Sequence, residues 1–176
     1  FDGRLGEPPG SCVINIDDEW GLALADELRA NGRRVITFSQ NTDADLTAEN
    51  IEVSLVRGTS FELKTPAGTR HITSPLVGKP HVYNMLAATG VALELGVDLA
   101  AVEKGLSVCV GAPGRFERVP HEGDFAVVVD YAHTDDALLN TLKTARELTD
   151  GRIITVFGCG GDRDKTKRPL VGAVAA

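Results

Sequence analysis

Three glycines precede a run of alternating charges in the segment 158–169, GCGGDRDKTKRP. Glycines can adopt positive φ and turn backbone N–H groups toward an anion, which Arg163, Lys167 and Arg168 can neutralise. The spacing matches neither the Walker loop nor the dinucleotide fingerprint. The density of charge behind the glycines favours an anion-binding loop over an ordinary α/β connection.

A second group of polar residues follows the apolar run 127–129. Asp130 and His133 come just after this run, at the end of a strand where α/β sheets collect ligands, and an aspartate there commonly accepts hydrogen bonds from ribose. A structural interpretation stays open, in which His133 is an ordinary loop histidine and Asp135 or Asp136 is the N-cap of the next helix.

Two further polar residues have both a binding and a structural interpretation. Arg115 lies near an expected domain boundary, where a cation can bridge two domains over a phosphate or ribose; alternatively it pairs with Glu117 or Glu122 at the surface. Asn84 lies near the start of an apolar helix. Its amide could recognise a base or simply face solvent.

The elements that position these residues begin with a β-α-β unit. Strands are expected at 11–16 and 35–39, with an amphipathic helix at about 19–30 between them. Asp18 is expected to cap that helix. Asp17 could cap it too, or could approach a metal or substrate.

The middle of the chain predicts hairpins and then helices. Alternating segments at 50–57, 60–65 and 70–73 indicate antiparallel strands joined by turns. Helices are expected at 80–95, with Pro80 in the first turn, and at 99–107 behind an Asp98 cap.

A new β-α-β series is expected beyond about residue 111, with strands at 125–130 and 153–157 around a helix at 135–148. The chain is therefore predicted to be α/β, with one domain at 1–110 and a second at 111–176.

Composition narrows the class of protein. The chain has 176 residues, 43% of them hydrophobic, and no apolar run near the roughly 20 residues that span a bilayer. Its net charge of −7 argues against nucleic-acid binding. Three widely spaced cysteines predict a reducing cytoplasm rather than disulfides or a zinc site.

These motifs stand in the order found in the Mur ligases, the ATP-dependent amino-acid ligases of peptidoglycan precursor synthesis. The chain resembles that family over nearly its whole length, and the segment 158–169 is similar to the branch that adds the third residue. The matching motifs are Asn15-x-Asp17-Asp18, Gly78-x5-Asn84-x2-Ala87-Ala88, Gly114-Arg115-Phe116-Glu117, Asp130-Tyr131-Ala132-His133 and 158–169.

The resemblance implies a fold and a reaction. Residues 1–110 would be the back of the central ATPase domain, a parallel sheet with small antiparallel strands, and 111–176 the start of the Rossmann-like C-terminal domain. ATP would phosphorylate the D-glutamyl carboxylate of UDP-N-acetylmuramoyl-L-alanyl-D-glutamate. A diamino acid, diaminopimelate or lysine, would then attack the acyl phosphate to form an amide.

The resemblance also implies nucleotide-binding roles. Asn84 would contact the adenine, Arg115 and Asp130 the ribose and phosphates, and His133 the nucleotide region. Charge stabilisation and positioning would do most of the catalysis.

Lys167 would be catalytic, approaching the phosphates, and Arg163 would bind the carboxylate of the incoming amino acid, a bidentate task suited to arginine. The family's phosphate-binding loop and Mg²⁺ ligands would precede Phe1, so no metal ligand is assigned here, and the segment alone is expected to be an inactive monomer. His81 stands where the family usually has asparagine. Folylpolyglutamate synthetase, cyanophycin synthetase and a non-catalytic nucleotide-binding module remain the alternatives.

Overall fold

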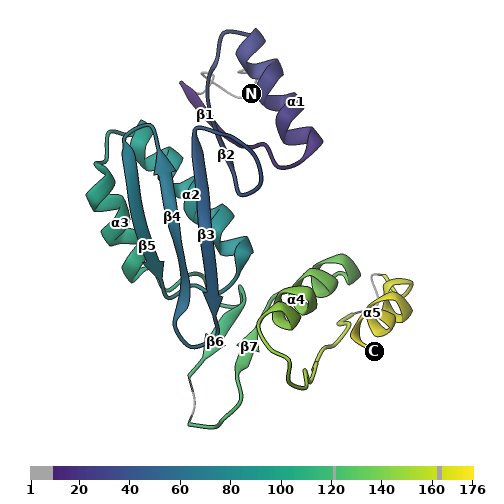
Figure 1. Cartoon of the computed structure of the whole chain (residues 1–176). Helices are drawn as coiled ribbons and strands as arrows, with labels where there is room; N and C mark the ends of the chain where they lie inside the picture. Colours follow the sequence, from purple (N-terminus) through teal and green to yellow (C-terminus); the bar gives the residue numbers. More distant parts are fainter. Residues whose placement is uncertain (1–9, 121, 162–163) are drawn as a thin grey trace. The chain divides into compact units, whose positions relative to one another are not determined.

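A computed structural model describes residues 10–120, 122–161 and 164–176 (Figure 1). The chain divides into two compact units. Unit 1 comprises the described residues up to Val53 together with Arg57–Val110, and unit 2 comprises Ser54–Val56 and the described part of Gly111–Ala176. Each unit has its own sheet and its own helices.

Unit 1 contains a mixed five-stranded sheet in the order β1-β2-β3-β4-β5. β1 and β2 are parallel along their length, as expected of a β-α-β unit, and β2 is also parallel to the first residues of β3. β4 and β5 form an antiparallel hairpin. The strands are β1 (Ser11–Asn15), β2 (Arg34–Ser39), β3 (Leu46–Ser54), β4 (Gly58–Thr65) and β5 (Gly68–Ser74).

The strand predicted at 50–57 is shifted toward the N-terminus. β3 begins at Leu46, and Leu46 and Ala48 are buried in the core. The alternation used for the prediction covered only the more exposed end of this strand. Its first residues pair with β2 across a short loop, Phe38 with Leu46 and Ser39 with Thr47.

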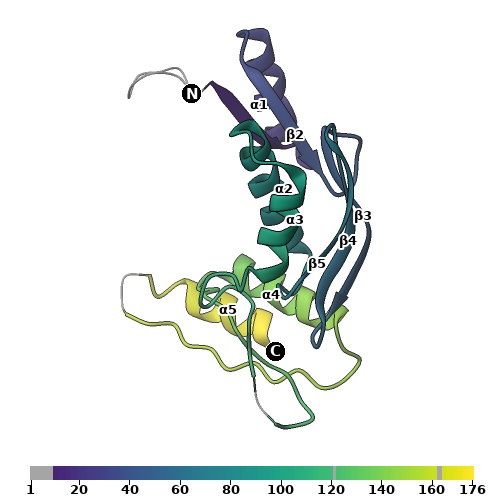
Figure 2. The same ribbon diagram turned by 90° about the vertical axis from the view of Figure 1, so that its left-hand side faces the viewer.

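Three helices complete unit 1, namely α1 (Glu19–Ala30), α2 (Lys79–Glu94) and α3 (Leu99–Val108). The predicted caps are confirmed: Asp18 accepts a hydrogen bond from the Gly21 N–H at 2.8 Å, and Asp98 one from the Ala101 N–H at 2.8 Å. Figure 2 shows α2 and α3 on one face of the strands β3–β5.

The core of unit 1 lies between that helical layer and the sheet. Its fully buried side chains come from both layers and pack as one cluster, which explains why these two helices and this hairpin form together. The largest of them are Phe61, Leu46, Leu63, Ile72, Leu86 and Val82.

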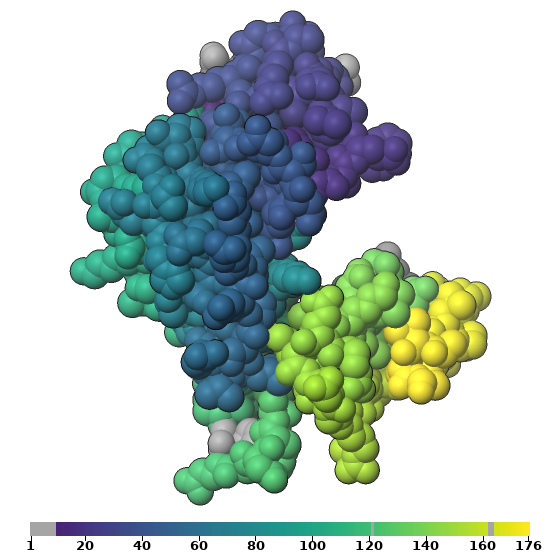
Figure 3. Space-filling view, viewed as in Figure 1, coloured from purple at the N-terminus to yellow at the C-terminus, as the bar shows by residue number. Residues whose placement is uncertain are grey.

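Unit 2 has a short antiparallel pair, β6 (Glu117–Val119) and β7 (Val127–Val129), and two helices, α4 (Asp135–Glu147) and α5 (Lys167–Ala175). The space-filling view in Figure 3 shows α4 and α5 in contact with each other. Thr134 caps α4 by accepting from the Ala137 N–H at 3.2 Å. The cap expected at Asp135 or Asp136 is therefore wrong.

The β-α-β series predicted for unit 2 does not form. β7 covers only part of 125–130 and pairs with β6, and the described segment 153–157 is not a strand. Ile154 is 71% exposed and Val156 93% exposed. A strand requires a neighbour for its backbone hydrogen bonds, and β7 has β6 as its neighbour instead.

Candidate functional site

Asp130 follows β7 directly and organises the loops around it. Its Oδ2 accepts from the Phe116 N–H at 2.8 Å, and its Oδ1 accepts from the Ala132 N–H at 2.9 Å. Oδ1 also lies 3.1 Å from the Thr141 hydroxyl, which shares its one proton between Asp130 and the Ala137 carbonyl at 3.0 Å. A carboxylate with backbone donors on both oxygens is held in one orientation. Asp130 therefore joins the turn before β6 to the loop before α4.

The turn that Asp130 holds carries Arg115. Gly114 and Phe116 both have positive φ, at 68° and 46°, so the backbone reverses sharply on either side of Arg115. The Tyr131 N–H donates to the Gly114 carbonyl at 2.7 Å, and the Gly114 N–H donates to Glu117 Oε2 at 2.7 Å. Glu117 therefore shapes this turn, whereas the sequence had suggested it as a salt-bridge partner.

Arg115, Tyr131 and His133 form a stack on the exposed side of these loops. The Arg115 guanidinium lies 5.6 Å from the centre of the Tyr131 ring, within the range of a cation–π contact. The Tyr131 and His133 rings are 5.1 Å apart and tilted by 56°. A planar cation and two aromatic rings together can bind a planar, negatively charged ligand.

Lys167 reaches the same loop from the first residue of α5. Its Nζ donates to the His133 carbonyl at 3.4 Å, and His133 Nδ1 lies 3.0 Å from the Tyr131 carbonyl. The structure thus brings together four residues predicted from sequence as site residues, namely Arg115, Asp130, His133 and Lys167.

The described part of the segment 158–169 is a loop tied to the start of α5. Asp164 Oδ1 accepts from the Thr166 hydroxyl at 2.6 Å and from its N–H at 3.0 Å, and these hydrogen bonds, the hydroxyl first, hold the pKa of Asp164 below its usual value. Arg168 donates to the Gly161 carbonyl at 2.8 Å. Arg163, predicted to bind the amino acid, lies outside the described residues.

Asn84, the remaining predicted residue, lies on α2 in unit 1 and is exposed, as both of its interpretations require. His81, one turn earlier, is 7% exposed. His81 is therefore packed inside unit 1.

Sequence reasoning missed a polar cluster beside Asn84, built around Asp17. The carboxylate of Asp17 accepts hydrogen bonds from the Ser39 hydroxyl, from the Gln40 N–H at 2.8 Å and from the Tyr83 hydroxyl at 2.7 Å. Asp17 is thus a structural acceptor, and the cap of α1 is Asp18 rather than Asp17. The signal was present in sequence as polar residues that end β1 and β2, two adjacent parallel strands.

Hydrogen bonding sets the charge state of this cluster. Desolvation by burial raises the pKa of Asp17, but its hydrogen bonds outweigh burial and leave the pKa below its ordinary value. Burial, the hydrogen bond to Asp17 and the charge of Asp17 together raise the pKa of Tyr83 to about 12. Asp17 is therefore ionised and Tyr83 neutral over the working range of most enzymes.

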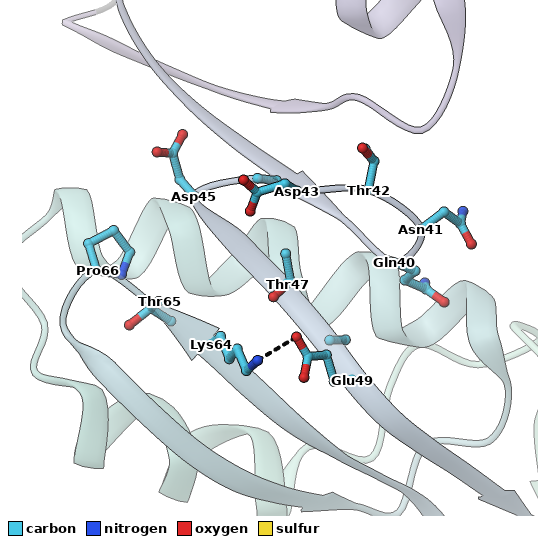
Figure 4. Close-up of a pocket in the computed structure, with 12 residues that line it drawn as sticks. Gln40, Asn41, Thr42, Asp43, Asp45, Thr47, Glu49, Lys64, Thr65 and Pro66 are labelled. Carbon is cyan, nitrogen blue, oxygen red and sulfur yellow. Dashed lines mark hydrogen bonds and ion pairs between the residues drawn. The ribbon is translucent and has the colours of Figure 1, made fainter.

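An open hollow of about 640 Å³ lies in unit 1, next to this cluster and lined in part by Gln40 and Asn41 (Figure 4). The β2–β3 loop and the β4–β5 hairpin line it, and its one lysine, Lys64, pairs with Glu49 at 2.5 Å. Asp43 and Asp45 give it a negative rim, which disfavours a polyphosphate. None of the residues predicted for the site lines it.

The described residues contain no group of three histidine, cysteine or acidic side chains placed to hold a metal ion. Likewise, among the described helices none has the length and apolarity to cross a membrane.

Comparison with known proteins accounts for both units. The Mur ligase middle domain model matches residues 5–92, and the model of the Mur ligase glutamate ligase domain matches residues 114–176. The chain belongs to the Mur ligase family. The α/β fold predicted from the sequence is confirmed, apart from the strand corrections in unit 2.

Two curated relatives of this Mur ligase chain carry the name UDP-N-acetylmuramoyl-L-alanyl-D-glutamate–2,6-diaminopimelate ligase. The protein of Bacillus velezensis is 45% identical over 96% of this chain, and that of Gloeobacter violaceus 49% identical over 95%. A solved structure of such a ligase is 36% identical, with a TM-score of 0.69 over 94% of the chain. The chain spans about a third of the length of each: 34%, 33% and 34%.

Proposed function

We propose that the chain forms part of an ATP-dependent ligase that adds a diamino acid to UDP-N-acetylmuramoyl-L-alanyl-D-glutamate. The observation that supports this most directly is the set of hydrogen bonds at Asp130, which holds the loops that carry Arg115, His133 and Lys167. The names of the relatives favour 2,6-diaminopimelate as the amino acid. Residues 1–110 would belong to the ATP-binding domain and 111–176 to the C-terminal ligase domain.

The proposed chemistry forms an acyl phosphate. The D-glutamyl carboxylate attacks the γ-phosphorus of ATP, ADP leaves, and the amino group of the diamino acid then displaces phosphate to give the amide. Lys167 would stabilise the charge on the transferring phosphoryl group. Arg163 would hold the carboxylate of the amino acid. Mg²⁺ would neutralise phosphate charge when bound, but the described residues supply no cluster for it.

The nucleotide would be held by the remaining residues. We assign the adenine to Asn84 and the ribose and phosphates to Arg115 and Asp130, with His133 beside them. Two backbone N–H groups and the Thr141 hydroxyl leave one lone pair of the Asp130 carboxylate, on Oδ2, where a ribose hydroxyl would bind.

The test is an assay of the protein expressed from its complete gene. Phosphate release is measured with ATP, UDP-N-acetylmuramoyl-L-alanyl-D-glutamate and either meso-diaminopimelate or L-lysine, with reactions lacking the amino acid as controls. Release that depends on one amino acid supports the proposal and identifies the substrate. If neither amino acid causes phosphate release, the proposal is refuted, and folylpolyglutamate synthesis, cyanophycin synthesis or a non-catalytic nucleotide-binding module is favoured.

Two variants test the individual roles. Arg163→Ala should raise the KM for the amino acid far more than that for ATP, with Arg152→Ala as the matched surface control; equal effects on both substrates refute the role of Arg163. Asp130→Ala should weaken ATP binding, and an unchanged affinity for ATP would exclude its ribose role.

A further inference from the structure

The cluster around Asp17 has a fixed direction of hydrogen bonding. The Ser39 hydroxyl accepts from the Asn41 N–H at 2.9 Å and from the Thr42 N–H at 2.7 Å. A hydroxyl has two lone pairs and one proton, so with both lone pairs in use Ser39 must donate its proton to Asp17. Position 17 therefore requires an acceptor facing Ser39.

Tyr83, on α2, also donates a hydrogen bond to Asp17. Its hydroxyl accepts from the Asn41 side-chain amide at 3.2 Å and donates to Asp17 Oδ2 at 2.7 Å. Since the Gln40 N–H also donates to Oδ2, every group around the carboxylate is a donor. An asparagine at position 17 would place an N–H₂ against one of these donors.

These contacts tie the start of α2 to the ends of β1 and β2. Gly78, the N-cap residue of α2, has no side chain with which to cap the helix. Side chains from outside the helix contact this end: the Gln40 amide donates to the Lys79 carbonyl at 3.0 Å, and Tyr83 is anchored on Asp17. The first two turns of α2 are thereby held from outside the helix.

We infer that Asp17 and Tyr83 are positioning residues for the nucleotide site, because they fix the segment of α2 that presents Asn84. Asn84 follows Tyr83 directly, so a rotation of this turn that released Tyr83 would also move the Asn84 amide. The inference rests on the proposed contact of Asn84 with adenine. It adds two residues that do not themselves touch the nucleotide.

The experiment uses the protein expressed from its complete gene, with Tyr83→Phe, Asp17→Asn and the surface control Asp26→Asn. Tyr83→Phe and Asp17→Asn should each raise the KM for ATP about tenfold, the size of losing one charge-assisted hydrogen bond. The KM for the diamino acid should stay within about twofold, because Arg163 and its loop belong to unit 2. Asp26→Asn should change neither KM.

A spectroscopic titration separates a positioning role from a loss of fold. The difference between the ultraviolet titrations of the wild type and Tyr83→Phe reports Tyr83 alone, with an expected pKa of about 12. Asp17→Asn should move that titration toward 10.0, the ordinary value, if Asp17 controls Tyr83. If Asp17→Asn does not fold, the kinetic comparison rests on Tyr83→Phe, which retains the ring.

The outcomes are distinct. An unchanged KM for ATP in Tyr83→Phe overturns the positioning role while leaving the proposed function intact. Equal rises in both KM values also overturn it, since they indicate general damage. A wild type that binds no ATP refutes the proposed function, and the positioning role with it, whatever the titration shows.

Discussion

Two aspartates near the ends of strands have very different surroundings. Asp17, after β1, is bonded to the end of β2 and to Tyr83 on α2, so it joins packed elements of a five-stranded sheet. Asp130, after β7, is bonded to Phe116 and Ala132 in two loops and to a helix hydroxyl. The same residue type near a strand end thus joins packed elements in unit 1 and joins two loops in unit 2.

The extent of apolar packing also differs between the two units. The larger buried cluster of unit 1 spans four strands and two helices, whereas the buried apolar side chains described in unit 2 are Phe116, Leu138 and Val171. Core substitutions should therefore reduce stability more in unit 1 than in unit 2.

The largest expected effect tests this difference in the core. Phe61→Ala removes a fully buried ring and should lower the free energy of unfolding by about 3–5 kcal/mol. Phe125→Ala in unit 2 is the matched control, since its ring is 66% exposed, and should change stability by less than about 1 kcal/mol. Urea denaturation measures both. Similar losses for the two variants would contradict the difference in packing.

The second prediction concerns the pH dependence of the scaffold aspartate. Asp17→Asn should cost on the order of 2 kcal/mol at neutral pH, as expected for hydrogen bonds to a charged group. The folded-state pKa of Asp17 lies below 3.8, so its contribution is present above that value and is lost as the pH falls through the folded-state pKa. The difference between the wild type and the variant should shrink in that window.

Urea midpoints measured from neutral pH down to below pH 3.8 would show this convergence. A difference that stays constant through the acid range would mean that the charge of Asp17 does not stabilise the fold. Asp26→Asn serves again as the control, because Asp26 is an exposed residue on α1.

Sequence predicted the positions of the strand-end residues better than their partners. The caps at Asp18 and Asp98 follow from local chemistry and were confirmed. The strand expected at 153–157 was wrong because an apolar run does not specify a neighbouring strand. Tyr83 was missed for a related reason: its partner Asp17 lies 66 residues away, beyond any local pattern.

The third prediction tests how Asp130 is held. Thr141→Val removes the hydroxyl donor 3.1 Å from Asp130 and should cost about 1 kcal/mol of stability, while weakening ATP binding only slightly because two backbone donors remain. Thr141→Ser keeps the hydroxyl and should retain both properties. Denaturation and ATP titration of the pair provide the measurement. An equal loss in Thr141→Ser, which keeps the hydroxyl, would mean that the hydroxyl does not account for the effect.

The smallest expected effect decides between the predicted strand and the observed loop. Val156→Ser should change the free energy of unfolding by less than about 0.5 kcal/mol, because a side chain that is 93% exposed loses no burial. A valine buried in a sheet would instead lose most of the roughly 1.5–3 kcal/mol gained by burying its side chain. Val82 is a fully buried position on α2. Denaturation of Val156→Ser and Val82→Ser side by side therefore compares the stability cost at an exposed and at a buried valine. A cost for Val156→Ser near that of Val82→Ser would mean that 153–157 pairs as a strand in solution, and would bring unit 2 closer to the β-α-β arrangement that its sequence suggests.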